Sequence, residues 1–108
     1  MKKDYFNDVL GNRLDKIQEV LVKKNEEYAN DQNIMHNFIE AGKLLGTTPE
    51  KALIYFMTKH IVSVMDMVNG IGEGLPPKSV EAIDEKMGDI INYSILLEAM
   101  LKERVTTK

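Results

Sequence analysis

The chain of 108 residues contains no cysteine and no tryptophan. Without cysteine it can form neither a disulfide bond nor a thiolate zinc site, and it has no cysteine nucleophile. No segment approaches the roughly 20 consecutive apolar residues that a membrane-spanning helix needs. Residues 1–4 (Met-Lys-Lys-Asp) reach an acidic residue at once, so we expect no signal peptide. The sequence therefore predicts a cytoplasmic protein with no membrane partner.

A basic excess is also missing. Fourteen Lys and Arg residues stand against seventeen Asp and Glu residues, and the net charge is −3. Proteins that bind the nucleic-acid backbone usually carry a basic patch or stripe, so we expect no direct binding of this kind. The chain is 44% hydrophobic and 29% charged. That balance is typical of a folded globular protein, and the length predicts a single domain over residues 1–108.

Apolar residues recur at helical spacing in four segments of the chain. The segments cover about residues 6–28, 34–45, 49–68 and 80–101. No segment shows the alternating pattern of a strand, and no internal repeat is present. The sequence therefore predicts an all-α fold, a single-domain antiparallel bundle of about four helices.

Several short signals predict where these helices begin and end. The polar run at residues 30–33 indicates a break and a cap before the second helix, and Gly46 is well placed to end that helix. Thr48 and Pro49 offer a hydroxyl cap and a first-turn proline for the third helix. Ser79 is expected to cap the fourth.

Residues 70–77 (Gly-Ile-Gly-Glu-Gly-Leu-Pro-Pro) form the longest predicted loop, because three glycines and two prolines oppose regular structure there. A glycine-rich segment can cradle a phosphate. This one lacks the Gly-Lys-Ser/Thr ending of a P-loop and follows no strand. We interpret it as a connector between the third and fourth helices.

The third helix is apolar on nearly every side. Between Ala52 and Val68, twelve of seventeen residues are apolar. A helix of this kind usually lies in the centre of a core or in an interface between subunits. The third and fourth helices carry more apolar surface than two short partners can cover, so we expect a homo-oligomer.

The fourth helix carries an acidic stripe. Glu81, Glu85 and Asp89 follow one another at four-residue steps, and Asn92 lies three residues further on. Like charges at this spacing repel each other by roughly 0.2–0.5 kcal/mol per pair. A hard cation such as Mg²⁺ would relieve the repulsion, because carboxylate oxygens are its preferred protein ligands. The alternative is a solvated acidic face without a metal.

The third helix carries a second polar stripe. Lys59, Ser63 and Asp66 lie at helical spacing within an otherwise apolar segment. A lysine in this position could hold a phosphate as a point charge, or the stripe could be a polar seam at the surface. His60 lies among apolar neighbours, where a core histidine bonded to one neighbour and a ligand-binding histidine are the alternatives.

Four short motifs together resemble small phage-encoded helical proteins. They are Lys24-Asn25-Glu26-Glu27-Tyr28, Asn37-Phe38, Lys59-His60 followed by Ser63, and the run from Glu85 to Tyr93. These motifs are similar to those of nucleotide-modification-associated helical domains. They are more distantly similar to MazG-like all-α nucleoside triphosphate pyrophosphohydrolases.

This resemblance implies a helical bundle, dimeric or larger, that handles nucleotides in the cytoplasm of an infected host cell. It implies Mg²⁺ as a cofactor, with Lys59 neutralising phosphate charge and Tyr28 contacting the base. The expected substrate-binding residues are Tyr28, Lys59, His60 and Asn92, and the expected metal ligands are Glu81, Glu85 and Asp89, with Asp84 as an alternative support. The chain departs from the enzyme pattern at Lys86, where the family has a glutamate.

Two functions from different classes follow. The first is a phage- or prophage-type protein that binds a nucleotide or nucleotide phosphate. If it is an enzyme, its reaction would be Mg²⁺-dependent hydrolysis of a nucleoside triphosphate to release pyrophosphate. The second is a non-catalytic interaction protein that binds a host protein or sequesters a signal nucleotide. The incomplete metal motif favours the second, and no individual catalytic residue is predicted.

Overall fold

The computed structural model describes residues 1–27 and 33–106. The chain divides into two compact units, Met1–Ile34 and Met35–Lys108. Four helices account for nearly all of the described residues, and no strand occurs among them. The predicted all-α class is therefore confirmed. No helix in the described part of the chain is long and apolar enough to cross a membrane.

The first unit consists of one long helix, α1, which covers Lys3–Glu27. Gly11 lies inside α1 without interrupting it, and a Cβ atom added there would meet nothing within 4 Å. The predicted apolar stripe is present on this helix. Three of its members, Phe6, Leu10 and Leu14, are about half exposed within the described structure.

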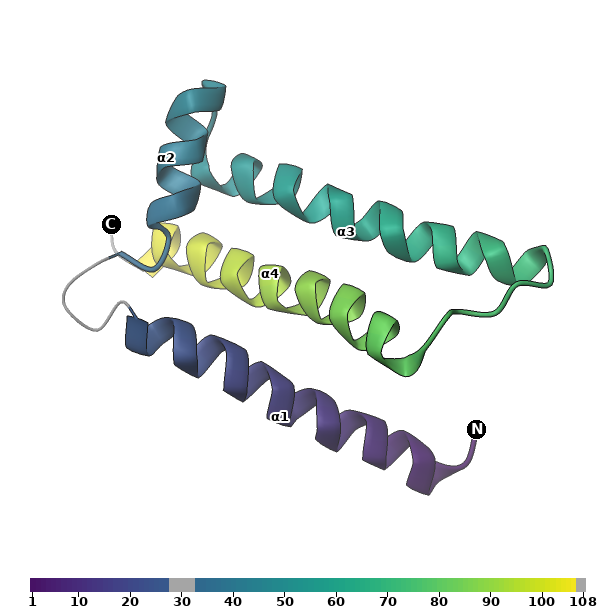
Figure 1. Ribbon diagram of the computed structural model, residues 1–108. Helices are drawn as coiled ribbons and strands as arrows, with labels where there is room; N and C mark the ends of the chain where they lie inside the picture. The colour runs from purple at the N-terminus through teal and green to yellow at the C-terminus, as the bar shows by residue number, and fades with distance from the viewer. Residues whose placement is uncertain (28–32, 107–108) are drawn as a thin grey trace. The chain divides into compact units, whose positions relative to one another are not determined.

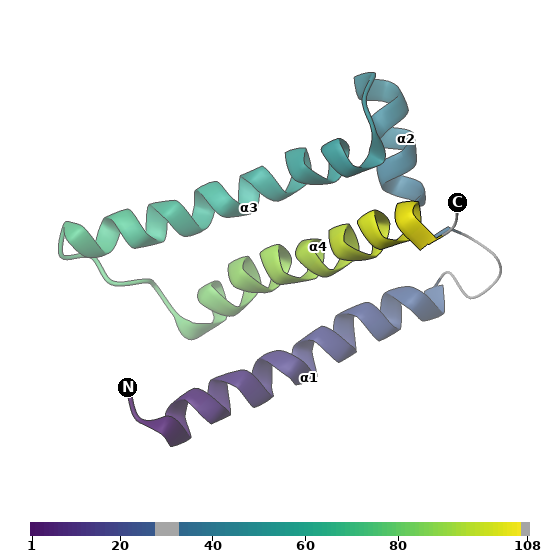
Figure 2. The same ribbon diagram turned by 180° about the vertical axis from the view of Figure 1, so that it is seen from behind.

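The second unit contains three helices. They are α2 (His36–Leu45), α3 (Pro49–Gly72) and α4 (Val80–Thr106). The long helices α3 and α4 lie side by side and run in opposite directions, while α2 packs across the N-terminal end of α3 (Figures 1 and 2). The predicted antiparallel packing is confirmed for this pair.

The predicted caps form at three of the four boundaries. The Thr48 hydroxyl accepts a hydrogen bond from the backbone N–H of Lys51 at 3.2 Å, and Pro49 occupies the first turn of α3. The Ser79 hydroxyl accepts from the N–H of Ala82 at 3.1 Å. Gly46 ends α2 in the left-handed conformation, with φ of 68°, which a residue without a Cβ adopts at little cost.

One predicted boundary is wrong, and another lies mainly outside the described residues. Met35 occupies the N-cap position of α2 and supplies no side-chain cap, while residues 30–32 of the predicted capping run lie outside the described part of the chain. The loop predicted from residue 70 begins later, since α3 continues through Gly72. Glycine inside a helix costs only about 1 kcal/mol, which the rest of a 24-residue helix can bear. The chain turns at Gly74, with φ of 81°, and the Leu75 N–H donates to the Gly70 carbonyl at 2.8 Å.

The core of the second unit lies where its three helices meet. Phe38 of α2, Leu53 of α3 and Met100 of α4 form a buried cluster. The Phe38 ring lies 6.0 Å, centroid to centroid, from both Phe56 and Tyr93. Farther along α3, no residue is buried. The all-round apolar α3 is therefore not central to a core in the described structure, where only Ala52 and Leu53 are buried.

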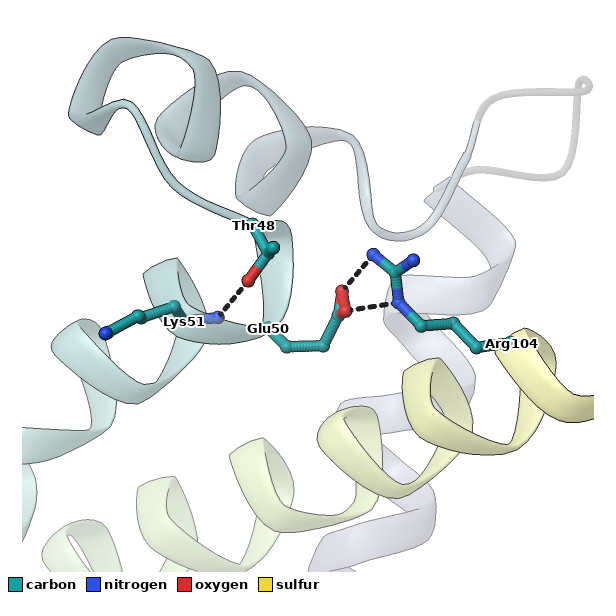
Figure 3. A network of polar contacts seen from close by, with 4 residues as sticks. All are labelled: Thr48, Glu50, Lys51 and Arg104. Atoms are coloured by element: carbon teal, nitrogen blue, oxygen red, sulfur yellow. Dashed lines mark hydrogen bonds and ion pairs between the residues drawn. The ribbon is translucent and has the colours of Figure 1, made fainter.

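An ion pair joins the start of α3 to the end of α4. The Arg104 guanidinium donates two hydrogen bonds to the Glu50 carboxylate, from Nε to Oε2 at 2.5 Å and from Nη2 to Oε1 at 2.7 Å (Figure 3). These hydrogen bonds lower the pKa of Glu50 below its usual value. Arg104 can make this contact because α3 and α4 are antiparallel, so that the last turn of α4 lies beside the first turn of α3.

This ion pair predicts a loss of stability in acid. The pKa of Glu50 is lower in the folded protein than in the unfolded chain, so the ionised Glu50 stabilises the fold. This stabilisation is present above the unfolded pKa of about 4.3 and is lost as the pH falls through the folded pKa. Arg104 is more than half exposed, so solvent screening keeps the effect small. In melting curves recorded from pH 7 to pH 3, the melting temperature of the wild type should exceed that of Glu50→Gln at pH 7. The two melting temperatures should converge in acid. A difference that persists unchanged to pH 3 would contradict this role.

Candidate functional site

The middle of the α3–α4 interface is polar. His60 Nδ1 of α3 lies 3.2 Å from Asp89 Oδ2 of α4, and the His60 side chain is only 20% exposed. The Tyr93 ring, one turn after Asp89, lies 5.6 Å from the His60 ring, centroid to centroid. The pairing of His60 with Asp89 agrees with the core histidine bonded to one neighbour. It also brings two predicted site residues together.

Tyr93 remains a neutral phenol in this setting. Its partial burial raises its pKa, and the nearby Asp89 carboxylate raises it further. The hydroxyl therefore keeps its proton at neutral pH and can act as a hydrogen-bond donor. Together, Asp89 and Tyr93 offer an acceptor and a donor on successive turns of α4.

Asn92 adds a buried acceptor to the same helix. Its Oδ1 atom is buried and has no hydrogen-bond partner among the described residues. A buried carbonyl oxygen without a partner costs about 1–3 kcal/mol, so such atoms are uncommon in folded proteins and call for an explanation. A ligand donor is one such explanation, and the substrate-binding role of Asn92 stays a prediction.

A pocket of about 360 Å³ opens between α3, the 73–79 loop and the first turns of α4. Its lining residues are Ser63, Asp66, Met67, Gly70, Leu75, Pro76, Lys78, Ala82 and Lys86. Ser63 follows His60 by three residues and Lys86 precedes Asp89 by three. The pocket therefore begins about one helical turn from the His60–Asp89 pair on both helices.

The walls of the pocket combine apolar surface with a few charges. Met67, Leu75, Pro76 and Ala82 supply the apolar part. Lys78 and Lys86 supply two positive charges, and Asp66 supplies one negative charge. The Ser63 hydroxyl donates to the Lys59 carbonyl at 3.1 Å, so its proton is used within the helix. A mainly apolar pocket with a few charged groups is the usual form of a small-molecule site.

The remaining predicted site residues lie in different places. Lys59 is exposed on α3 and lies one turn before Ser63, without lining the pocket. Glu81 and Glu85 are exposed on α4. Tyr28 lies outside the described residues.

The acidic stripe of α4 meets the requirements of a metal site only in part. No three His, Asp or Glu side chains come together as a metal-binding group in the part of the chain that the structure describes. Glu85 and Asp89 remain as neighbours at i, i+4 on α4, where side chains lie on one face. Mg²⁺ is commonly held by one or two carboxylates together with substrate phosphates, so a role for Glu85 and Asp89 in holding the cation stays a prediction.

The sequence interpretation missed the pocket. Residues 70–77 were interpreted as a plain connector, whereas Leu75 and Pro76 form part of the pocket wall, and Lys78 follows them. One available signal was Lys78 itself, a lysine placed directly after two prolines that hold the chain in a restricted conformation. A second is Lys86, a lysine in the place where the MazG-like motif has a glutamate.

Comparison of the chain with protein-family models, with curated proteins and with solved structures finds no match. The function must therefore be argued from the site itself.

Proposed function

We propose that this protein binds a nucleotide and holds its phosphate groups in the α3–α4 pocket. The observation that carries the proposal is the pair of lysines, Lys78 and Lys86, in a pocket of about 360 Å³ that has an apolar wall. A nucleotide has the same two-part character, a flat base and an anionic phosphate chain. Lysine binds phosphate as a point charge, and the apolar wall offers a surface for the base.

The polar residues beside the pocket extend the proposed site. Asn92 Oδ1 would accept a hydrogen bond from the ligand, which would give the buried oxygen a partner. His60 and Asp89, about one turn from the pocket lining, would orient the ligand, since they hold each other in place at 3.2 Å. Lys59 would neutralise phosphate charge at the rim. The resemblance to MazG-like proteins adds Tyr28 as a contact for the base.

Mg²⁺ would be held by Glu85 and Asp89 together with the phosphates of the ligand, with Glu81 or Asp84 in support. When bound, the cation would neutralise phosphate charge and lower the pKa of a bound water. The described residues offer no third carboxylate in one group with these two. Lys86 occupies the place where the MazG-like motif has a glutamate. Both facts favour nucleotide binding or sequestration by a phage-type protein over hydrolysis.

Binding can be tested by isothermal titration of the pure protein with the common nucleoside di- and triphosphates, in MgCl₂ and in EDTA. We expect one class of nucleotide to bind. Lys86→Gln should weaken that binding roughly ten- to a hundredfold, because a hydrogen bond to a charged group contributes about 1.5–3 kcal/mol. Lys51→Gln is the matched control, since Lys51 is an exposed lysine of the same helix pair at least 12 residues from the pocket lining on α3.

The same mixtures separate the two functions. Pyrophosphate release that EDTA abolishes would identify an enzyme, and binding without release would identify a sequestering protein. Equal losses of affinity in Lys86→Gln and Lys51→Gln would remove the pocket from the proposal. No binding of any nucleotide at millimolar concentration would overturn nucleotide binding itself and leave the host-protein alternative.

A further inference from the structure

Helix α3 carries two apolar seams on adjacent sides. The first contains Leu53, Met57, His60, Val64 and Met67, at alternating steps of four and three residues. This seam lies against α4. Leu53 joins Met100 in the core, His60 pairs with Asp89, and the Ser94 hydroxyl lies 3.9 Å from the Met57 sulfur. The first seam is thus already occupied within the chain.

The second seam starts one residue later and has the same spacing. Its positions are 54, 58, 61, 65 and 68, and it is widened on one side by Tyr55 and Val62. We call the six large apolar residues among these positions the exposed α3 face: Ile54, Tyr55, Ile61, Val62, Met65 and Val68. Each of the six is between 37% and 60% exposed in the described structure. Steps of four and three residues are the pattern by which one long helix packs against another.

The exposed α3 face is suited to a dry contact with another helix. It contains no charged residue. Thr58, the polar position within the second seam, donates its hydroxyl proton to the Ile54 carbonyl at 2.8 Å, so burial would leave no unpaired donor at Thr58. At about half exposure, six such side chains present on the order of 600 Å², at the upper end of what monomers usually expose as one patch.

The charges beside this face distinguish between its possible partners. Lys59 and Asp66 are exposed and lie two turns apart on the same side of the face, next to Tyr55 and Val62. In a parallel pair of identical helices, residues on one flank lie on the opposite side of the interface from their own copies, so Lys59 and Asp66 of the two helices would not meet. In an antiparallel pair centred between residues 62 and 63, Lys59 of each helix lies opposite Asp66 of the other. The flanking charges therefore complement those of an identical antiparallel helix.

We propose that the exposed α3 face binds the same face of a second copy of this chain, antiparallel, about a two-fold axis near Val62. Pairing two such faces buries on the order of 1,200 Å², the lower end of the range for specific interfaces. The pairing also places the partner's Lys59 beside Asp66, which lines the pocket. The second copy thus adds a positive charge at the pocket rim. The proposal does not depend on nucleotide binding.

The absence of native cysteine allows a direct test by disulfide cross-linking. A cysteine at Val62 lies next to the proposed axis, so two copies of Val62→Cys should link under mild oxidation. Val68→Cys is the matched control, because Val68 is on the same face and more exposed. In the antiparallel pair, the two cysteines at position 68 would stand about 16 Å apart along the helix axes. That distance exceeds the roughly 7 Å limit between bridged Cα atoms.

Light scattering supplies the second measurement. The wild-type protein should have the mass of a dimer, twice the chain mass of 12.3 kDa. Met65→Lys should have the mass of a monomer, and circular dichroism should show that its helix content is unchanged. Lys59→Asp should weaken the dimer, and adding Asp66→Lys should restore it. A wild-type monomer at about 100 μM would overturn the proposal, as expected if α1 or an unrelated protein covers this face. Cross-linking at position 68 as readily as at position 62 would overturn the antiparallel orientation.

Discussion

Replacing Gly42 by alanine is expected to lower the free energy of unfolding by about 1–3 kcal/mol, although alanine is the better helix former. Gly42 is buried in α2 where the chain turns back into α3. A Cβ atom at this position would lie 2.8 Å from the Thr47 carbonyl oxygen and 3.1 Å from the Thr48 carbonyl carbon. Both are backbone atoms. They cannot rotate away as a side chain could, so the connection between α2 and α3 would have to shift.

The same substitution at Gly11 is the matched control. Gly11 is also inside a helix, but a Cβ atom there meets nothing within 4 Å. Gly11→Ala should therefore increase stability by up to about 1 kcal/mol, the ordinary gain in helix propensity. Urea unfolding followed by circular dichroism measures both variants. A gain in stability for Gly42→Ala would show that the α2–α3 connection tolerates a methyl group and that the close approach is not required.

This pair of glycines illustrates what the sequence could predict. Both glycines lie in predicted helices, and nothing in the neighbouring residues distinguishes a glycine in open space from one pressed against backbone. The caps at Thr48 and Ser79 could be predicted because the hydroxyl and the N–H that it accepts from lie three residues apart. The end of α3 could not, because the energy of about one additional turn depends on how Leu75 folds back over Gly70.

In the candidate site, contacts between residues far apart in the chain could not be predicted from the sequence either. The sequence singled out His60 and Asp89 separately, one as a core histidine or ligand and the other as a metal ligand. Their contact at 3.2 Å depends on the register between two antiparallel helices, and residues 29 positions apart carry no local signal of that register. Lysines on an amphipathic helix or loop are usually solvated, so the sequence positions of Lys78 and Lys86 do not by themselves indicate that the two residues share a pocket. Only the fold shows that they line a common pocket.

Asn92→Leu is expected to raise the free energy of unfolding by about 1–3 kcal/mol. The Oδ1 atom of Asn92 is buried without a hydrogen-bond partner among the described residues. Leucine has the same branching as asparagine and removes the unpaired oxygen, so the cost of burying that atom disappears. Asn7→Leu on the exposed surface of α1 is the control, since it changes helix propensity alone and should gain only about 0.5 kcal/mol.

The same variant separates a structural role from a functional one. Suppose that Asn92 Oδ1 accepts a hydrogen bond from the nucleotide. Asn92→Leu should then be more stable than wild type and yet bind the nucleotide at least tenfold more weakly. The affinity falls because the donor group of the ligand would be buried without a hydrogen-bond partner. Stability comes from urea unfolding and affinity from titration, each measured beside Asn7→Leu. A stabilised Asn92→Leu with unchanged affinity would make the buried oxygen a packing defect and remove Asn92 from the site. A destabilised variant would show that the amide has a partner in the folded protein. The predicted combination of higher stability and weaker binding is expected of a residue that remains polar because a ligand requires it, since the folded chain alone gains nothing from that oxygen.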